Sequence, residues 1–152
     1  MKPVTKQNID DFLNCKTIAI AGVSRNEKSF SAQVAVHLQQ LGYELWQINP
    51  NFDQTLLKEK KVKTISEMPP NVNNLLILTS SSQTESVLQQ AIEKGIKQIW
   101  IQQKSDTPTT LKMGFESGIN MIYGHCIFMF SQPEGFHKFH YNLKKFFGGI
   151  PK

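Results

Sequence analysis

Short apolar runs alternate with stretches of helical periodicity along almost the whole chain, and this alternation limits the folds that the sequence can adopt. The runs are too short for helices and rich in β-branched residues, which is typical of strands buried on both faces of a parallel sheet. We expect strands at 17–22, 44–49, 62–65, 74–79, 97–102 and 119–124.

The segments between these runs carry apolar residues at steps of three and four, the period of a helix with one buried face. Glycines follow several of them, as expected where a helix ends in the left-handed conformation. Thr107 before Pro108 predicts an N-cap with a first-turn proline, and Ser82 with Glu85 predicts a capping box. We expect helices at about 6–14, 30–41, 82–94, 108–117 and 135–147.

Strands and helices in this order can cover both faces of a sheet only if the helices lie on both sides of parallel strands with right-handed crossovers. The sequence therefore predicts an α/β, Rossmann-like three-layer fold with a mostly parallel sheet. The length of 152 residues is typical of a single domain, and we expect that domain to extend over 1–152. The connection at 50–61 is predicted to be a surface loop.

The composition of the chain limits the cellular compartment and the classes of partner that we expect for the protein. Lysines make up all but one of the 17 cationic residues and are spread over the chain, as in a solvated surface, so we expect no nucleic-acid partner. The apolar runs are shorter than the roughly 18 residues of a membrane span. Cys15 and Cys126 form no disulfide framework, and the first residues lack the pattern of a signal peptide. We therefore expect a cytoplasmic protein without a membrane partner.

The crevice beyond the carboxyl ends of the strands is where open parallel sheets bind ligands, so the residues that follow each strand are candidate binding residues. Here they are polar, small or backbone-shaping. They are Gly22, Val23, Ser24, Arg25 and Lys28 after the first expected strand, Asn49 and Pro50 after the second, Thr79, Ser80 and Ser81 after the fourth, and Gln102 after the fifth.

The loop after the first strand carries the strongest of these signals. Gly22 permits a tight turn into the next helix, whose first amides attract anions. Ser24, Arg25 and Lys28 add a hydroxyl and two positive charges that can hold phosphate. Glycine and serine are common in any turn between strand and helix, so a purely structural loop is the alternative interpretation.

Two familiar nucleotide-binding motifs are missing from this loop. Gly22 stands alone, so neither G-x-G-x-x-G nor the G-x-x-x-x-G-K-[ST] motif is present. An NAD site would place an acidic residue at the end of the second strand, whereas Asn49 stands there. A neutral amide tolerates a phosphorylated ribose. An enzyme that uses NAD(P) or another nucleotide is the alternative function.

Candidate catalytic groups do not form a recognisable arrangement of nucleophile, base and orienting acid. His137 and His140 share a helical face, and together with His125 and Cys126 they would supply four zinc ligands, but their spacing is not a recognised zinc pattern. We expect no metal site. Cys126 is predicted to be a small buried hydrophobe and His37 a structural residue.

Several segments, taken in order, resemble one known family. They are IAIAGVSRNEKSF, GYELWQINPN, NLLILT with its hydroxyl loop, GIKQIWIQ and GINMIYGHCI. The chain resembles the small stand-alone CoA-binding proteins, which are similar to the nucleotide-binding domain of the succinyl-CoA synthetase alpha subunit. The resemblance covers about residues 8–147.

The resemblance implies a Rossmann-like domain that binds coenzyme A or an acyl-CoA. It implies that the pyrophosphate lies over the Gly22–Lys28 loop, and that the adenosine end lies near Asn49, Pro50 and the loop from Thr79. It does not identify a protein partner, and both a monomer and a homodimer are compatible with it. Because the second domain of the synthetase would not fit in 152 residues, the resemblance does not imply its reaction.

Three places differ from the family's pattern. The glycine that commonly follows the loop lysine is replaced within Ser29–Ser31, a Pro-Pro pair is replaced by Ser80 and Ser81, and the proline of a Trp-x-Gln-Pro-Gly segment is replaced by Gln103. All three lie around the predicted crevice.

Overall fold

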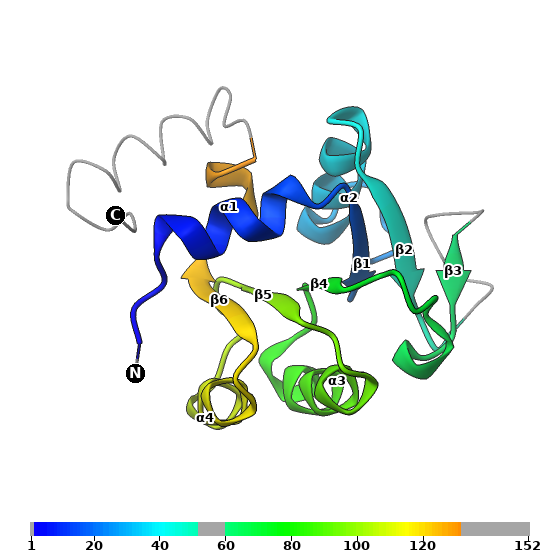
Figure 1. Ribbon diagram of the computed structural model, residues 1–152. Helices are drawn as coiled ribbons and strands as arrows, with labels where there is room; N and C mark the ends of the chain where they lie inside the picture. The colour runs from blue at the N-terminus through cyan, green and yellow to red at the C-terminus, as the bar shows by residue number, and fades with distance from the viewer. Residues whose placement is uncertain (1, 52–59, 132–152) are drawn as a thin grey trace.

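The computed structural model describes residues 2–51 and 60–131, which form a six-stranded sheet (Figure 1). Its strands are β1 (Thr17–Ala21), β2 (Glu44–Ile48), β3 (Lys61–Val62), β4 (Asn74–Ile77), β5 (Gln98–Gln102) and β6 (Asn120–His125). The order across the sheet is β3-β2-β1-β4-β5-β6, and every described pairing is parallel. The predicted α/β, Rossmann-like fold is confirmed.

Helices cover both faces of this sheet, with α1 and α2 on one side and α3 and α4 on the other (Figure 1). The described helices are α1 (Lys6–Asn14), α2 (Phe30–Gln40), α3 (Ser81–Lys94) and α4 (Pro108–Ser117), with short 3-10 helices η2 (Ile65–Glu67) and η3 (Ile127–Met129). The helix expected at 135–147 lies outside the described residues, as does most of the connection at 50–61.

The alternation of side chains along the strands produces a core on each face of the sheet. Ile18 and Ile20 of β1 pack under α1 and α2, whereas Ala19 and Ala21 pack on the side of α3 and α4. Trp100 of β5 is fully buried on the α1 side. Both faces are therefore apolar, which explains why the strands read as continuous apolar runs in the sequence.

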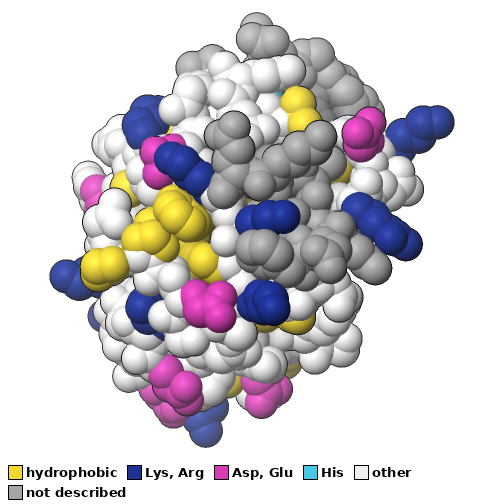
Figure 2. Space-filling model, turned by 90° about the vertical axis from the view of Figure 1, so that its right-hand side faces the viewer, with side chains coloured by type: hydrophobic (Ala, Val, Ile, Leu, Met, Phe, Trp, Pro, Cys, Tyr) yellow, Lys and Arg dark blue, Asp and Glu magenta, His cyan; other side chains and the backbone are white. Residues whose placement is uncertain are grey.

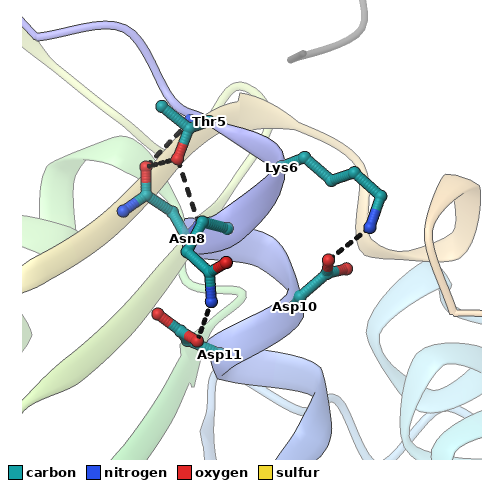
Figure 3. Close-up of polar contacts among 6 residues, drawn as sticks. Thr5, Lys6, Asn8, Asp10 and Asp11 are labelled. Atoms are coloured by element: carbon teal, nitrogen blue, oxygen red, sulfur yellow. Dashed lines mark hydrogen bonds and ion pairs between the residues drawn. The ribbon is translucent and has the colours of Figure 1, made fainter.

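Helix α1 is held at both its beginning and its outer face by local contacts (Figure 3). Thr5 caps it, because its Oγ1 accepts from the Asn8 amide at 3.2 Å while the Asn8 Oδ1 accepts from the Thr5 amide at 2.8 Å. Lys6 forms an ion pair with Asp10 one turn later. The Asn8 Nδ2 also donates to the Asn120 Oδ1 at 2.8 Å, so the helix is tied to β6.

Two local predictions are wrong. The third strand ends at Val62, because the Lys63 amide donates to the Glu67 carboxylate at 2.9 Å instead of continuing the ladder. The capping box is not formed, since α3 begins at Ser81 with Ser80 as its N-cap and no side-chain cap bond. The Ser82 hydroxyl instead lies 3.0 Å from the Ser80 hydroxyl.

The charged side chains of both signs are mixed on the face beside β3. Figure 2 shows Lys and Arg side chains interspersed with Asp and Glu on that face. This is the pattern of a solvated surface. In the described parts of the chain, no helix combines the length and apolar character needed to cross a membrane.

Candidate functional site

A cleft of about 630 Å³ lies at the carboxyl ends of β1, β2 and β4. The order of strands reverses between β1 and β4, which is the position where doubly wound folds bind ligands. The volume is in the range typical of cofactor pockets. The lining residues are Ala21, Gly22, Val23, Ser24, Ile48, Asn49, Pro50, Asn51, Lys63, Thr64, Ile65, Thr79, Ser82, Gln83, Ser86, Val87 and Gln90.

Gly22 brings two of the loops around this cleft into direct contact. Its φ is +89°, and a Cβ built on it would lie 2.5 Å from the Thr79 nitrogen and 2.6 Å from the Leu78 carbonyl carbon. The Leu78 amide donates to the Ala21 carbonyl at 2.8 Å beside it. The backbones after β1 and β4 therefore meet at the floor of the cleft, and only glycine leaves room for that approach.

The turn between β1 and α2 is stabilised by its own side chains. The Ser24 amide donates to the Ser31 Oγ at 2.9 Å, and the Asn26 amide donates to the Ser24 Oγ at 3.1 Å. The Lys28 amide donates to the Asn26 Oδ1 at 3.0 Å. Because these amides hold the turn, an anion at this loop depends mainly on the exposed side chains of Arg25 and Lys28.

The structure brings together about half of the predicted site residues. Those that line the cleft are Gly22, Val23, Ser24, Asn49, Pro50 and Thr79. Arg25, Lys28, Ser80 and Ser81 are exposed on the loops beside it, outside the lining. Gln102 is neither exposed nor part of the lining.

Gln102 has a structural contact in the interior. Its side chain is 6% exposed, and its Oε1 accepts from the Ile127 amide at 3.1 Å. The bond fixes the start of η3 after β6. The buried backbone amide of Ile127 would lose its acceptor if the Gln102 side chain were replaced by an aliphatic one.

Replacing Gln102 with leucine is expected to lower the free energy of unfolding by about 1–3 kcal/mol, because the buried Ile127 amide is left without a partner. Urea denaturation measures this change. The matched control is Gln103→Leu, at the half-buried neighbouring position. Unchanged stability, together with weaker coenzyme binding, would instead make Gln102 a ligand contact.

The hydroxyls at the start of α3 form an ordered chain. Thr84 is fully buried, and its Oγ1 donates to the Ser80 carbonyl at 3.0 Å and lies 2.9 Å from the Thr79 Oγ1. A hydroxyl has one proton. Since the proton of Thr84 is committed to Ser80, Thr79 donates to Thr84 and presents acceptor lone pairs to the cleft.

The sequence reasoning missed one wall of the cleft, on helix α3. Ser82, Ser86 and Gln90 line the cleft at intervals of four residues, together with Gln83 and Val87 between them. The sequence signal for this wall was a series of polar residues spaced four apart on α3. It runs beside the buried residues Thr84, Leu88 and Ala91. A search confined to the loops after the strands cannot find a helix face.

The sequence reasoning also missed the segment after β3. Lys63, Thr64 and Ile65 line the cleft beyond the short edge strand. Lys63 is the one charged side chain in the described lining, which otherwise consists of hydroxyls, amides, aliphatic groups and glycine. This composition suits a sugar and a neutral heterocycle, with an anionic group at one point.

The four side chains weighed above as zinc ligands lie only partly within the described residues. Among residues 2–51 and 60–131, no group of three or more His, Cys, Asp or Glu side chains is placed to hold a metal ion. Cys126 is buried, as expected, and the His37 Nε2 lies 2.7 Å from the Ser131 carbonyl. His137 and His140 lie outside the described residues.

Solved structures with this fold are known. A protein from Pyrococcus horikoshii has a TM-score of 0.73 and 24% identity, over 84% of this chain and 92% of its own. An acetyl-coenzyme A synthetase from Candidatus Korarchaeum cryptofilum, in complex with phosphate and ADP, has a TM-score of 0.64 and 18% identity, over 74% of this chain and 26% of its own. At these identities the similarity establishes the fold.

Sequence comparison extends this similarity to a family. The uncharacterized Bacillus subtilis protein YneT is 27% identical over 128 residues, which are 84% of this chain and 94% of YneT. The sequence profile of the CoA binding domain matches residues 16–132, a range that contains every residue lining the cleft. The chain therefore belongs to the CoA-binding domain family.

Proposed function

We propose that the protein binds coenzyme A or an acyl-CoA in the cleft and acts as a binding module rather than an enzyme. The observation that carries the proposal is the position of the cleft, at the reversal of strand order and within the residues that match the CoA-binding family. In the described lining there is no carboxylate, imidazole or thiol to act as a base or nucleophile.

The chemistry of the lining favours one orientation of the ligand. Pro50 and Val87 supply apolar surface for the adenine ring, and the Thr79 hydroxyl supplies an acceptor. The pyrophosphate then lies over the Gly22–Lys28 loop, within reach of the Arg25 guanidinium, since arginine binds phosphate with two parallel hydrogen bonds.

The proposal extends to the cellular compartment and to the assembly of the protein. Cys15 and Cys126 are free thiols, which suits the reducing cytoplasm. We take residues 1–152 as one domain, either monomeric or in a homodimer. The module would sequester the coenzyme or report its level to a protein partner.

Coenzyme A is expected to raise the melting temperature by about 5–10 °C at a hundredfold excess over its Kd. A ligand that binds only the native state adds about 2.7 kcal/mol there, and each kcal/mol shifts the melting temperature of a chain this long by about 2–4 °C. Differential scanning fluorimetry measures the shift. The absence of a shift at millimolar coenzyme would contradict the proposal, and tighter binding of NAD or NADP with substrate turnover would favour the enzyme.

Arg25→Ala is expected to halve that shift at the same coenzyme concentration, because loss of a charged hydrogen bond weakens binding about tenfold. The matched control is Lys97→Ala, which removes an exposed cation from the segment between α3 and β5, outside the cleft lining. An unchanged shift in Arg25→Ala would remove Arg25 from phosphate binding.

A further inference from the structure

Thr84 is a buried polar residue on α3 that reaches the cleft through another side chain. It is fully buried and is not part of the cleft lining. Its Oγ1 lies 3.0 Å from the Ser80 carbonyl oxygen and 2.9 Å from the Thr79 Oγ1. Because Thr79 lines the cleft, Thr84 connects the interior of the protein to a hydroxyl of the candidate site.

The two hydrogen bonds of Thr84 fix the direction of the Thr79 hydroxyl. A carbonyl oxygen can only accept, so the single proton of the Thr84 hydroxyl goes to Ser80. The bond between the two threonines then forms only if Thr79 donates its own proton to Thr84. The Thr79 hydroxyl is left with lone pairs for a ligand, whereas a hydroxyl without such a partner can rotate and either donate or accept.

Burial keeps this arrangement in place when a ligand binds. Thr84 is fully buried, so water cannot reach it to replace a lost partner. If Thr79 turned its proton to the cleft, two oxygens 2.9 Å apart would face each other with lone pairs alone, at low local dielectric. Thr79 therefore presents a fixed acceptor, which favours a donor on the ligand and disfavours an acceptor.

We propose that Thr84 is a positioning residue that, through Thr79, makes the cleft select the 6-amino group of adenine. The inference rests on the proposed function and deepens it. Adenine carries a donor at position 6, whereas guanine carries a carbonyl acceptor there, as does hypoxanthine. In doubly wound folds the end of the second strand contacts the ribose. That position is Asn49 here, so the base extends toward the end of β4 and the apolar side chain of Val87.

The test is isothermal titration of the full chain with coenzyme A and with desamino-CoA, in which a 6-oxo group replaces the 6-amino group. The unmodified protein is expected to bind coenzyme A about tenfold more tightly, because the 6-oxo form loses a hydrogen bond and places two acceptors against each other. Thr84→Val removes the acceptor behind Thr79 and lets that hydroxyl donate, so we expect both forms to bind with equal affinity. Thr84→Ser keeps the hydroxyl and is expected to keep the preference.

Thr84→Val is expected to fold, because the Ser80 carbonyl still accepts from the Gln83 amide at 2.9 Å and from the backbone amide of residue 84 at 3.1 Å. Thr79→Val is a second, independent variant. It removes the acceptor from the cleft itself, so it is expected to weaken coenzyme A binding about tenfold and to remove the preference as well.

The matched control is Thr110→Val on α4. Thr110 is also fully buried, its Oγ1 donates to the Thr107 carbonyl at 2.9 Å, and it lies outside the cleft lining. Loss of this hydroxyl should lower stability and leave the preference for coenzyme A unchanged.

Equal affinity of the unmodified protein for the two coenzyme forms would overturn the proposal, and it is the result expected if the ribose hydroxyl donates to Thr79 instead. A preference that persists in Thr84→Val or in Thr79→Val, or that disappears in Thr110→Val, would overturn it as well. Failure of both forms to bind the unmodified protein would overturn the proposed function itself.

Discussion

Replacing Gly22 with alanine is expected to lower the free energy of unfolding by about 2–5 kcal/mol and to abolish coenzyme binding. The left-handed conformation at φ +89° costs an L-residue about 1–2 kcal/mol. The added Cβ would also overlap the Thr79 backbone at 2.5 Å, and forcing the two loops apart costs about 1–3 kcal/mol more. Because these loops form the floor of the cleft, the same change deforms the binding site.

Gly42→Ala separates the two causes. Gly42 has a φ of +88°, almost the same as Gly22, but a Cβ there would meet nothing within 4 Å. We therefore expect Gly42→Ala to cost only the conformational part, about 1–2 kcal/mol, and to leave coenzyme binding intact. Urea denaturation of both variants gives the difference. Equal losses of unfolding free energy in the two variants would mean that the contact between the loops does not contribute to stability.

Replacing Trp100 with alanine is expected to lower the free energy of unfolding by about 3–5 kcal/mol, since removal of a large core side chain leaves a cavity. The indole is fully buried and packs edge-on against Phe12 at 5.5 Å between ring centroids. Its Nε1 donates to the His125 carbonyl at 3.1 Å, near the shift of register between β5 and β6. The residue therefore joins α1 to the β6 edge of the sheet.

Trp100→Phe tests the two contributions separately. It keeps an aromatic ring beside Phe12 and removes the hydrogen bond to His125, so we expect a loss of about 1–3 kcal/mol. Val36→Ala is the exposed control, since Val36 is 44% exposed, and should cost less than about 1 kcal/mol. If Trp100→Ala cost no more than Val36→Ala in thermal unfolding, the described packing would be wrong.

The fold was predictable because apolar runs and segments of helical periodicity alternate along almost the whole chain. The strands are buried on both faces, so each reads as an apolar run, and Gly95 and Gly118 end helices in the left-handed conformation where the sequence indicated. The errors arose where contacts between elements, rather than the local sequence, decide where an element begins or ends. The third strand was predicted at 62–65, whereas β3 consists of Lys61 and Val62. An edge strand pairs on one side only, so it leaves a weak apolar pattern in the sequence.

The candidate site was predictable where it is built from loops after strands. Gly22, Asn49 and Thr79 line the cleft because they follow adjacent parallel strands, as the rule for such sheets requires. The contribution of α3 was missed, since it depends on which face of a helix turns to the cleft. Gln102 follows the same rule by position, but its side chain turns to Ile127 in the interior.

The most direct measurement is a crystal structure of the protein with coenzyme A bound. Our account predicts density for the pyrophosphate beside the Gly22–Lys28 loop and for the adenosine between Asn49 and Thr79. Coenzyme bound at another surface, or density absent from the cleft at saturating coenzyme, would contradict it.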